Sequence, residues 1–211
     1  MGGRYVVAVS LILAILQNLQ KNMANAFSSS IGSLVSEQPI APYQVINRYK
    51  GFEERVYESS AWACTEQRGE YRDQDQISVF LGLFAYINGE NDKGINMGMS
   101  TPVSIYYDNR GSSQLFEACF YVHPSQQNNP PEPTNNNVFI RTRPSMTVYT
   151  REFGGFATDQ SDWLSEARKL TRLVEAAGKS VQTDVMFWNA YDAPVKFWNR
   201  RNEVWLLKME E

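Results

Sequence analysis

The sequence predicts an α+β fold, in which a distorted antiparallel sheet or barrel is covered by two α-helices. Short segments with strand-like alternation follow one another between residues 43 and 209, and two helical stretches interrupt them. Each helical stretch ends at a glycine, Gly89 or Gly178, after which strand signals resume. The chain therefore repeats one plan, which predicts two halves related by a pseudo-two-fold axis.

Nine segments carry the strand signal, and Lys50-Gly51 forms a hairpin turn between the first two. In the fifth segment, Phe116, Ala118, Phe120 and Val122 alternate onto one face, which marks its core side. The expected strands are 43–50, 52–58, 61–67, 95–107, 114–123, 138–143, 146–153, 183–191 and 203–209.

Two stretches have apolar residues at helical spacing. The first begins at Asp73 or Asp75 and ends at Asn88-Gly89. Its apolar stripe consists of Ile77, Phe80, Leu81, Phe84 and Ile87. The second begins at Asp159 or Ser161 and ends at Gly178. Its stripe consists of Trp163, Ala167, Leu170, Val174 and Ala177.

The amino-terminal residues 1–26 have the pattern of a secretory signal peptide. Arg4 precedes the apolar run Tyr5–Leu16, and Ala24-Asn25-Ala26 offers small residues for cleavage. The apolar run is shorter than the roughly 20 residues needed to span a bilayer. We expect a secreted chain without a membrane span after cleavage, with a flexible segment at 27–42 and a folded domain at 43–211. A frayed amphipathic helix on a cytoplasmic protein is the alternative.

Composition excludes several classes of function. The chain has 20 basic and 23 acidic residues, a net charge of −3 and no basic run, which argues against nucleic-acid binding. One histidine and two cysteines are too few for the common zinc sites. Cys64 and Cys119 could form a disulfide in an oxidising compartment or remain two buried thiols, and both interpretations stay open.

Residues able to perform catalysis are scarce. His123 lies at the end of a predicted strand, where it would be an axial metal ligand, a general base or, in the simplest interpretation, a surface histidine. Cys64 would need a nearby base to act as a nucleophile. We therefore expect a binding protein and not an enzyme.

Several motifs, in order and at compatible spacing over residues 43–209, give the chain a family resemblance. The sequence resembles the SOUL/haem-binding protein family, which implies a distorted barrel with two helices and non-covalent binding of haem or a related tetrapyrrole. The motifs are 49–57 (YKGFEERVY), 86–94 (YINGENDKG) with 97–103 (MGMSTPV), 120–122 (FYV), 153–156 (FGGF) and 191–206.

The resemblance also implies where the ligand lies, in a shallow apolar cleft beside the first helix and without an essential axial histidine. In this sequence the corresponding positions are Ile77, Phe80, Leu81, Phe84 and Lys196. Ile77 replaces an arginine of a family member, which removes one partner for a propionate, while Lys196 matches a family lysine. The resulting expectation is a monomeric carrier or buffer of haem or another porphyrin. The alternative is a protein-interaction module with a vestigial pocket.

Overall fold

The computed structural model describes residues 38–70, 73–157, 159–192, 196 and 198–209, and within the first helix it describes side chains from Val79 onward. The expected signal peptide lies outside the described residues, as does most of the segment expected to be flexible. Residues 39–41 of that segment pair with Thr101: the Ala41 amide donates to Thr101 O, and the Thr101 amide donates to Pro39 O, both at 2.8 Å. This part of the segment is therefore held against the domain.

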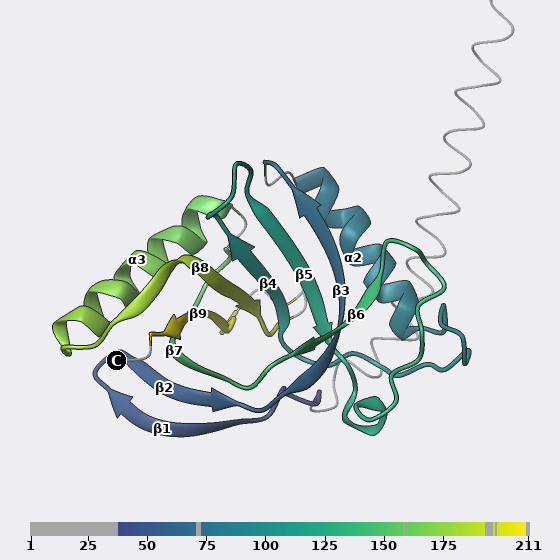
Figure 1. Cartoon of the computed structure of the whole chain (residues 1–211), viewed down its shortest axis with the longest axis horizontal. Helices are drawn as coiled ribbons and strands as arrows, with labels where there is room; N and C mark the ends of the chain where they lie inside the picture. The colour runs from purple at the N-terminus through teal and green to yellow at the C-terminus, as the bar shows by residue number, and fades with distance from the viewer. Residues whose placement is uncertain (1–37, 71–72, 158, 193–195, 197, 210–211) are drawn as a thin grey trace, which may run out of the picture. The chain divides into compact units, whose positions relative to one another are not determined.

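Nine strands and two α-helices follow in the order that the sequence predicts (Figure 1). The first half contains β1 (Tyr43–Tyr49), β2 (Phe52–Tyr57), β3 (Ser60–Arg68), α2 (Asp73–Ile87), β4 (Val103–Asp108) and β5 (Leu115–Tyr121). A short 3-10 turn, η1 (Pro124–Gln126), precedes the second half. The second half contains β6 (Phe139–Arg143), β7 (Met146–Phe153), α3 (Gln160–Ala176), β8 (Val181–Ala190) and β9 (Asn202–Lys208).

The strands form one curled antiparallel sheet in the order β1-β2-β7-β9-β8-β4-β5-β3-β6. The units β3-α2-β4-β5 and β7-α3-β8-β9 have the same connectivity, and β4 and β8 pair where the two units meet. The predicted pseudo-two-fold repeat of a distorted barrel with two helices is thus confirmed.

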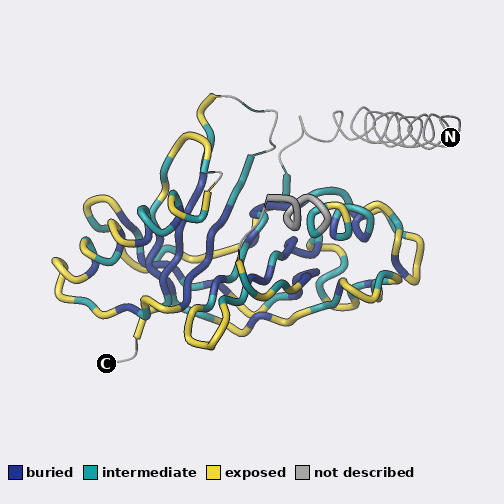
Figure 2. Tube along the Cα trace, turned by 90° about the horizontal axis from the view of Figure 1, so that it is seen from above, coloured by how far each residue is buried: buried dark blue, intermediate teal, exposed yellow. Residues whose placement is uncertain are grey.

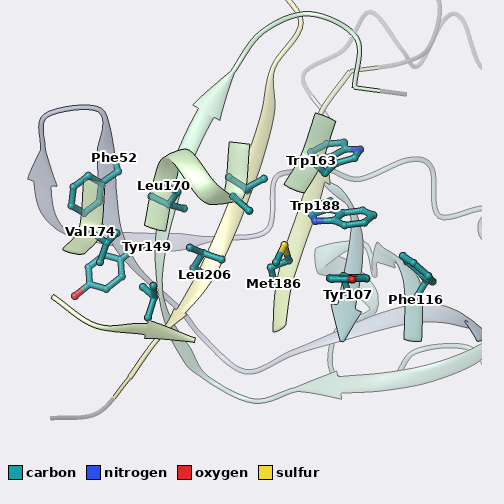
Figure 3. Close-up of a cluster of buried hydrophobic side chains, with 13 residues drawn as sticks. Phe52, Tyr107, Phe116, Tyr149, Trp163, Leu170, Val174, Met186, Trp188 and Leu206 are labelled. Carbon is teal, nitrogen blue, oxygen red and sulfur yellow. The ribbon is translucent and has the colours of Figure 1, made fainter. Parts of the chain in front are cut away.

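Alternation along the strands divides the sheet into two buried faces. On one face, α3 covers a cluster that includes Trp163, Trp188 and Leu206 (Figure 3), and α2 covers another that includes Leu83 and Phe120. The strand residues that alternate with these point to the opposite, concave face of the sheet. Cys119, Phe187 and Trp205 belong to a third cluster on that face. Most strands are accordingly buried along much of their length, whereas β1 has no buried residue and many of the loops are exposed (Figure 2).

The cluster under α3 is built on stacked aromatic rings. Trp163 of α3 stacks on Trp188 of β8 with centroids 6.0 Å apart, and Tyr107 of β4 stacks on the other side of Trp188 at 5.0 Å (Figure 3). The predicted stripe of α3 is buried at Trp163, Ala167, Leu170 and Val174, whereas Ala177 is the exposed C-cap.

The expected strand 95–107 is shorter in the structure, because only Val103–Asp108 pairs along β4. Residues 88–102 form a loop that the Asn91 side chain stabilises, since Asn91 Nδ2 donates to Tyr86 O and to Ile95 O, both at 2.9 Å. Gly89, Gly94 and Gly98 have positive φ, so the backbone cannot remain extended there.

Candidate functional site

A cavity of about 130 Å³ lies between α2 and the sheet. Helix α2 contributes Val79, Phe80 and Leu83 to its wall. Strands β3, β4 and β5 contribute the other residues, Thr65, Gln67, Val103, Ile105, Phe116, Ala118 and Phe120. None of these lining residues is charged, so the cleft suits an apolar surface.

Two phenylalanines on successive turns of α2 lie at this site: Phe80 lines the cavity, whereas Phe84 stacks on Phe80 outside the lining. Phe80 and Phe84 are half-buried, and their rings stack with centroids 5.8 Å apart and planes 16° from parallel. Phe80 also meets Phe120 of β5 edge to face at 5.5 Å, which fixes the Phe80 ring against the sheet. Leu81 lies beside them with 39% of its surface exposed and does not line the cavity.

The face of α2 that packs on the sheet agrees with the expected stripe at Phe80, Phe84 and Ile87 and differs from it at Leu81. Leu83, Tyr86 and Ile87 are buried, with Val79 packed against the same cluster, whereas Leu81 points away. The prediction that Leu81 belongs to the core face of the helix is therefore wrong. The predicted stripe consists of Ile77, Phe80, Leu81, Phe84 and Ile87. Because the helix is apolar on nearly all sides, periodicity alone could not choose its buried face.

Sequence reasoning missed Thr65 and Gln67 of β3, which line the cavity. Trp62 and Cys64 alternate with these residues along β3, and both belong to the concave cluster. The opposite face of the same strand, which includes Ala63, faces the helix. Strand alternation thus carried the signal for Thr65 and Gln67.

Of the other two expected tetrapyrrole contacts, the Ile77 side chain lies outside the described part of α2. Lys196 lies in the connection between β8 and β9, where its Nζ is 2.5 Å from Asp192 Oδ1. Asp192 also accepts a hydrogen bond from the Arg201 amide at 2.5 Å. Lys196 does not line the cavity. Because its ammonium group is already paired with Asp192, a carboxylate ligand would compete with Asp192 for it.

His123 caps the short turn η1. Its Nδ1 lies 2.9 Å from Ser125 Oγ and accepts a hydrogen bond from the Ser125 amide at 3.3 Å. The residue belongs to the connection between β5 and β6 and does not line the cavity. These contacts give His123 a local structural role.

Cys64 and Cys119 are fully buried on directly opposed positions of β3 and β5, and their sulfurs form a disulfide. The bond lies on the concave face, across the sheet from α2. Because both sulfurs are in the disulfide, Cys64 carries no free thiol for nucleophilic chemistry.

An ion-pair network centred on Glu203 lies within the curled sheet. Glu203 is fully buried, and its oxygens accept hydrogen bonds from Arg55 Nη1 at 3.1 and 3.0 Å, from Arg201 Nη2 at 2.6 Å and from Trp205 Nε1 at 2.8 Å. Burial alone would raise the pKa of Glu203, but the charge of Arg55 and the hydrogen bonds from Arg201 and Trp205 together lower it. The network therefore holds Glu203 as a carboxylate, with its oxygens occupied by structural partners.

Arg143 is a second buried charge on the concave face. Its guanidinium lies 4.2 Å from the centre of the Trp62 ring, and its Nη1 donates to Ser104 Oγ at 2.9 Å. Burial lowers the pKa of Arg143 to about 9, against the opposing effect of Glu117. Glu203 and Arg143 do not line the α2 cavity, so they contribute to the interior of the sheet and not to the cleft wall.

The chain is thus a domain of α+β class with a mostly apolar cleft beside stacked aromatic rings. The sequence profile of the SOUL heme-binding protein family matches residues 38–207. The chain belongs to this family.

Relatives agree with this assignment. The chain is 34% identical over 174 residues to "Heme-binding protein 1" of Sus scrofa, covering 79% of this chain and 91% of that protein. It is 38% identical over 160 residues to the Xenopus laevis protein of the same name, covering 74% and 83%. "Heme-binding protein 2" of Homo sapiens is 33% identical over 164 residues, covering 76% and 79%.

Among solved structures, the C-terminal domain of EcmrR has a TM-score of 0.56 at 12% identity, covering 80% of this chain and 99% of that domain. This likeness shows a shared fold only. In the part of the chain that the structure describes, no helix combines the length and apolar character needed to cross a membrane.

Proposed function

We propose that the protein binds haem or a related tetrapyrrole non-covalently and serves as a carrier or buffer, without catalysing a reaction. The observation that carries the proposal is the aromatic face of α2, where Phe80 and Phe84 stack beside an uncharged cleft. The family relationship and the names of the relatives support the same ligand class.

The size of the cleft determines how a ring would bind. Enclosed ligand sites usually measure about 300–1,000 Å³, whereas this cavity measures about 130 Å³. A tetrapyrrole would therefore lie across the half-exposed rings of Phe80 and Phe84 and the exposed Leu81, with only part of one edge entering the cavity. Burial of apolar surface, at roughly 25 cal/mol per Å², would supply most of the affinity.

The donor groups of the site fit a haem held by its apolar faces. No histidine, cysteine or charged residue lines the described cavity wall, so an axial protein ligand is not expected from it. Lys196 would supply one charge-assisted contact to a propionate, and Ile77 on the first turns of α2 would add apolar area. When bound, the group supplies the iron and the visible absorption; the chain supplies the apolar surface.

Haemin titration followed at the Soret band tests the proposal. We expect a saturable spectral change at micromolar haemin that Phe84→Asp removes, because a carboxylate would be buried against the ring. Leu81→Asp provides a second variant at an exposed position, where loss of folding is not expected. Ile46→Asp is the matched control, since Ile46 is 45% exposed on β1.

Haemin binding that does not saturate, or wild-type affinity for haemin in both α2 variants, would contradict the proposal that the tetrapyrrole binds beside α2. The small cavity also favours a second candidate, an interaction module whose pocket no longer binds a ligand. In that case haemin titration would produce no saturable change of the Soret band. Alteration of the loop at residues 124–137 would abolish binding of a protein partner.

We also propose that residues 1–26 direct export and that the secreted protein is a monomer. The buried disulfide supports an oxidising compartment, because such bonds are rare in the cytosol. Intact-mass measurement of protein from the medium tests export. A mass beginning at Phe27 is expected, and retention of the full chain inside the cell would contradict it.

A further inference from the structure

A second and larger cavity lies on the other helix of the fold. It measures about 770 Å³ and is an open groove between the β1–β2 turn and the last turns of α3. Figure 1 shows the carboxyl end of α3 beside this hairpin turn. The volume falls within the usual range for small-molecule sites, about 300–1,000 Å³.

The apolar part of this groove, here called the α3 groove, comes from both elements. Tyr49 and Phe52 stack with centroids 4.5 Å apart and planes 4° from parallel, and Leu173 and Ala176 face them from α3. Gly51 forms the turn between them: its φ is +88°, a conformation that favours glycine, and the turn faces Leu173 of α3.

Four cations also line the α3 groove: Lys50, Arg151, Lys169 and Arg172. Glu166 pairs with Arg151 at 3.1 Å and with Lys169 at 2.6 Å, so its single charge is shared between them. Arg151 also donates to Gly51 O at 3.2 Å.

The other two cations remain available to a ligand. Within the described ranges, Lys50 and Arg172 have no ion-pair partner. The groove is thus strongly cationic, although the whole chain carries a net charge of −3.

We propose that the α3 groove binds a long-chain carboxylate, with the chain along Tyr49, Leu173 and Ala176 and the head group between Lys50 and Arg172. Apolar walls select the chain, and the unpaired cations select its negative charge; Arg172 is suited to a bidentate contact with a carboxylate. This site is separate from the α2 cleft and does not rest on the proposed haem function.

Calorimetric titration with dodecanoate tests the proposal, with dodecyltrimethylammonium as the probe of equal chain length and opposite charge. We expect saturable dodecanoate binding below millimolar concentration, at least tenfold tighter than binding of the cation. The double variant Lys50→Gln/Arg172→Gln should weaken dodecanoate at least tenfold. The charge-matched control Lys93→Gln/Arg110→Gln, at two cations outside the groove, should not.

Ala176→Trp gives a test that leaves the charges intact, because Ala176 is exposed and the indole would fill the groove. It should abolish binding while the thermal unfolding temperature stays within a few degrees. Equal affinity for both probes, or unchanged dodecanoate binding in the double variant and in Ala176→Trp, would overturn the proposal.

Discussion

Phe80 and Phe84 stack one helical turn apart on α2, and Phe120 of β5 holds the first ring edge to face from the sheet. The pair is thereby held as a half-buried aromatic surface, on which we propose that the flat ligand lies. Preorganisation of this kind lowers the entropic cost of binding.

Lys196→Gln should weaken haemin binding by a factor between about 1.4 and 5, because an exposed ion pair is worth about 0.2–1 kcal/mol. The lysine is 38% exposed and already paired with Asp192, so its net contribution to a propionate contact is small. Lys196→Arg should retain wild-type affinity, since it preserves the charge. A Soret titration that shows no difference between the Gln and Arg variants would remove Lys196 from the site.

His123→Ala should leave the visible spectrum of the haemin complex unchanged. The imidazole is hydrogen-bonded to Ser125 and caps η1, away from the lining of the α2 cavity. Absorption and magnetic circular dichroism spectra of the two complexes provide the comparison. A shift from a six- to a five-coordinate spectrum in the variant would instead identify His123 as an axial ligand.

Glu203→Gln should destabilise the domain by about 3 kcal/mol at pH 7, because it removes the fully buried carboxylate that pairs with Arg55 and Arg201 and leaves Arg55 only its partly exposed partner Glu53. Urea unfolding measures the change. The control is Glu66→Gln, whose partner Arg68 is 60% exposed, and we expect that variant to lose less than about 1 kcal/mol.

Glu203 also makes the free energy of unfolding depend on pH. Since folding lowers the pKa of Glu203 below its usual value of 4.5, its carboxylate stabilises the native state above that pH. This contribution disappears as the pH falls through the lower, folded-state pKa. The free energy of unfolding should therefore decline below about pH 4.5, and less steeply in Glu203→Gln. Identical slopes in the two proteins would contradict the assigned shift.

Removal of the disulfide should also destabilise the domain. The bond joins residues 55 positions apart, and loop-closure entropy for such a length corresponds to about 4 kcal/mol. Urea unfolding of Cys64→Ala/Cys119→Ala should show this loss, and the wild-type mass should be two hydrogens below that of the reduced chain. An unchanged mass would instead support two buried thiols.

Much of the fold is predictable from local sequence patterns. Alternation and glycine positions locate the strands, the two helices and the repeat, because these signals act over a few residues. The face of β5 that carries Ala118 and Phe120 is a core face as expected, and the structure shows that it packs under α2. The opposite face does not meet solvent, since Cys119 and Tyr121 belong to the concave cluster; curling of the sheet buries both sides.

The candidate site is less predictable, because it depends on how elements meet. The rotation of α2, which exposes Leu81 and buries Leu83, follows from packing on the sheet and not from an amphipathic stripe. The α3 groove was missed for a related reason. Lys50 and Arg172 are more than a hundred positions apart in the sequence, and only the folded hairpin brings them to one groove.

Methyl NMR spectra recorded with zinc protoporphyrin, a diamagnetic tetrapyrrole, test the central claim most directly. A ring bound beside α2 should shift the methyl signals of Val79, Val103 and Ile105 through its ring current, because all three line the cavity. The methyl signals of Leu173 in the α3 groove should remain in place. Shifts confined to Leu173, or no saturable shift at any methyl group, would contradict tetrapyrrole binding at the α2 cleft.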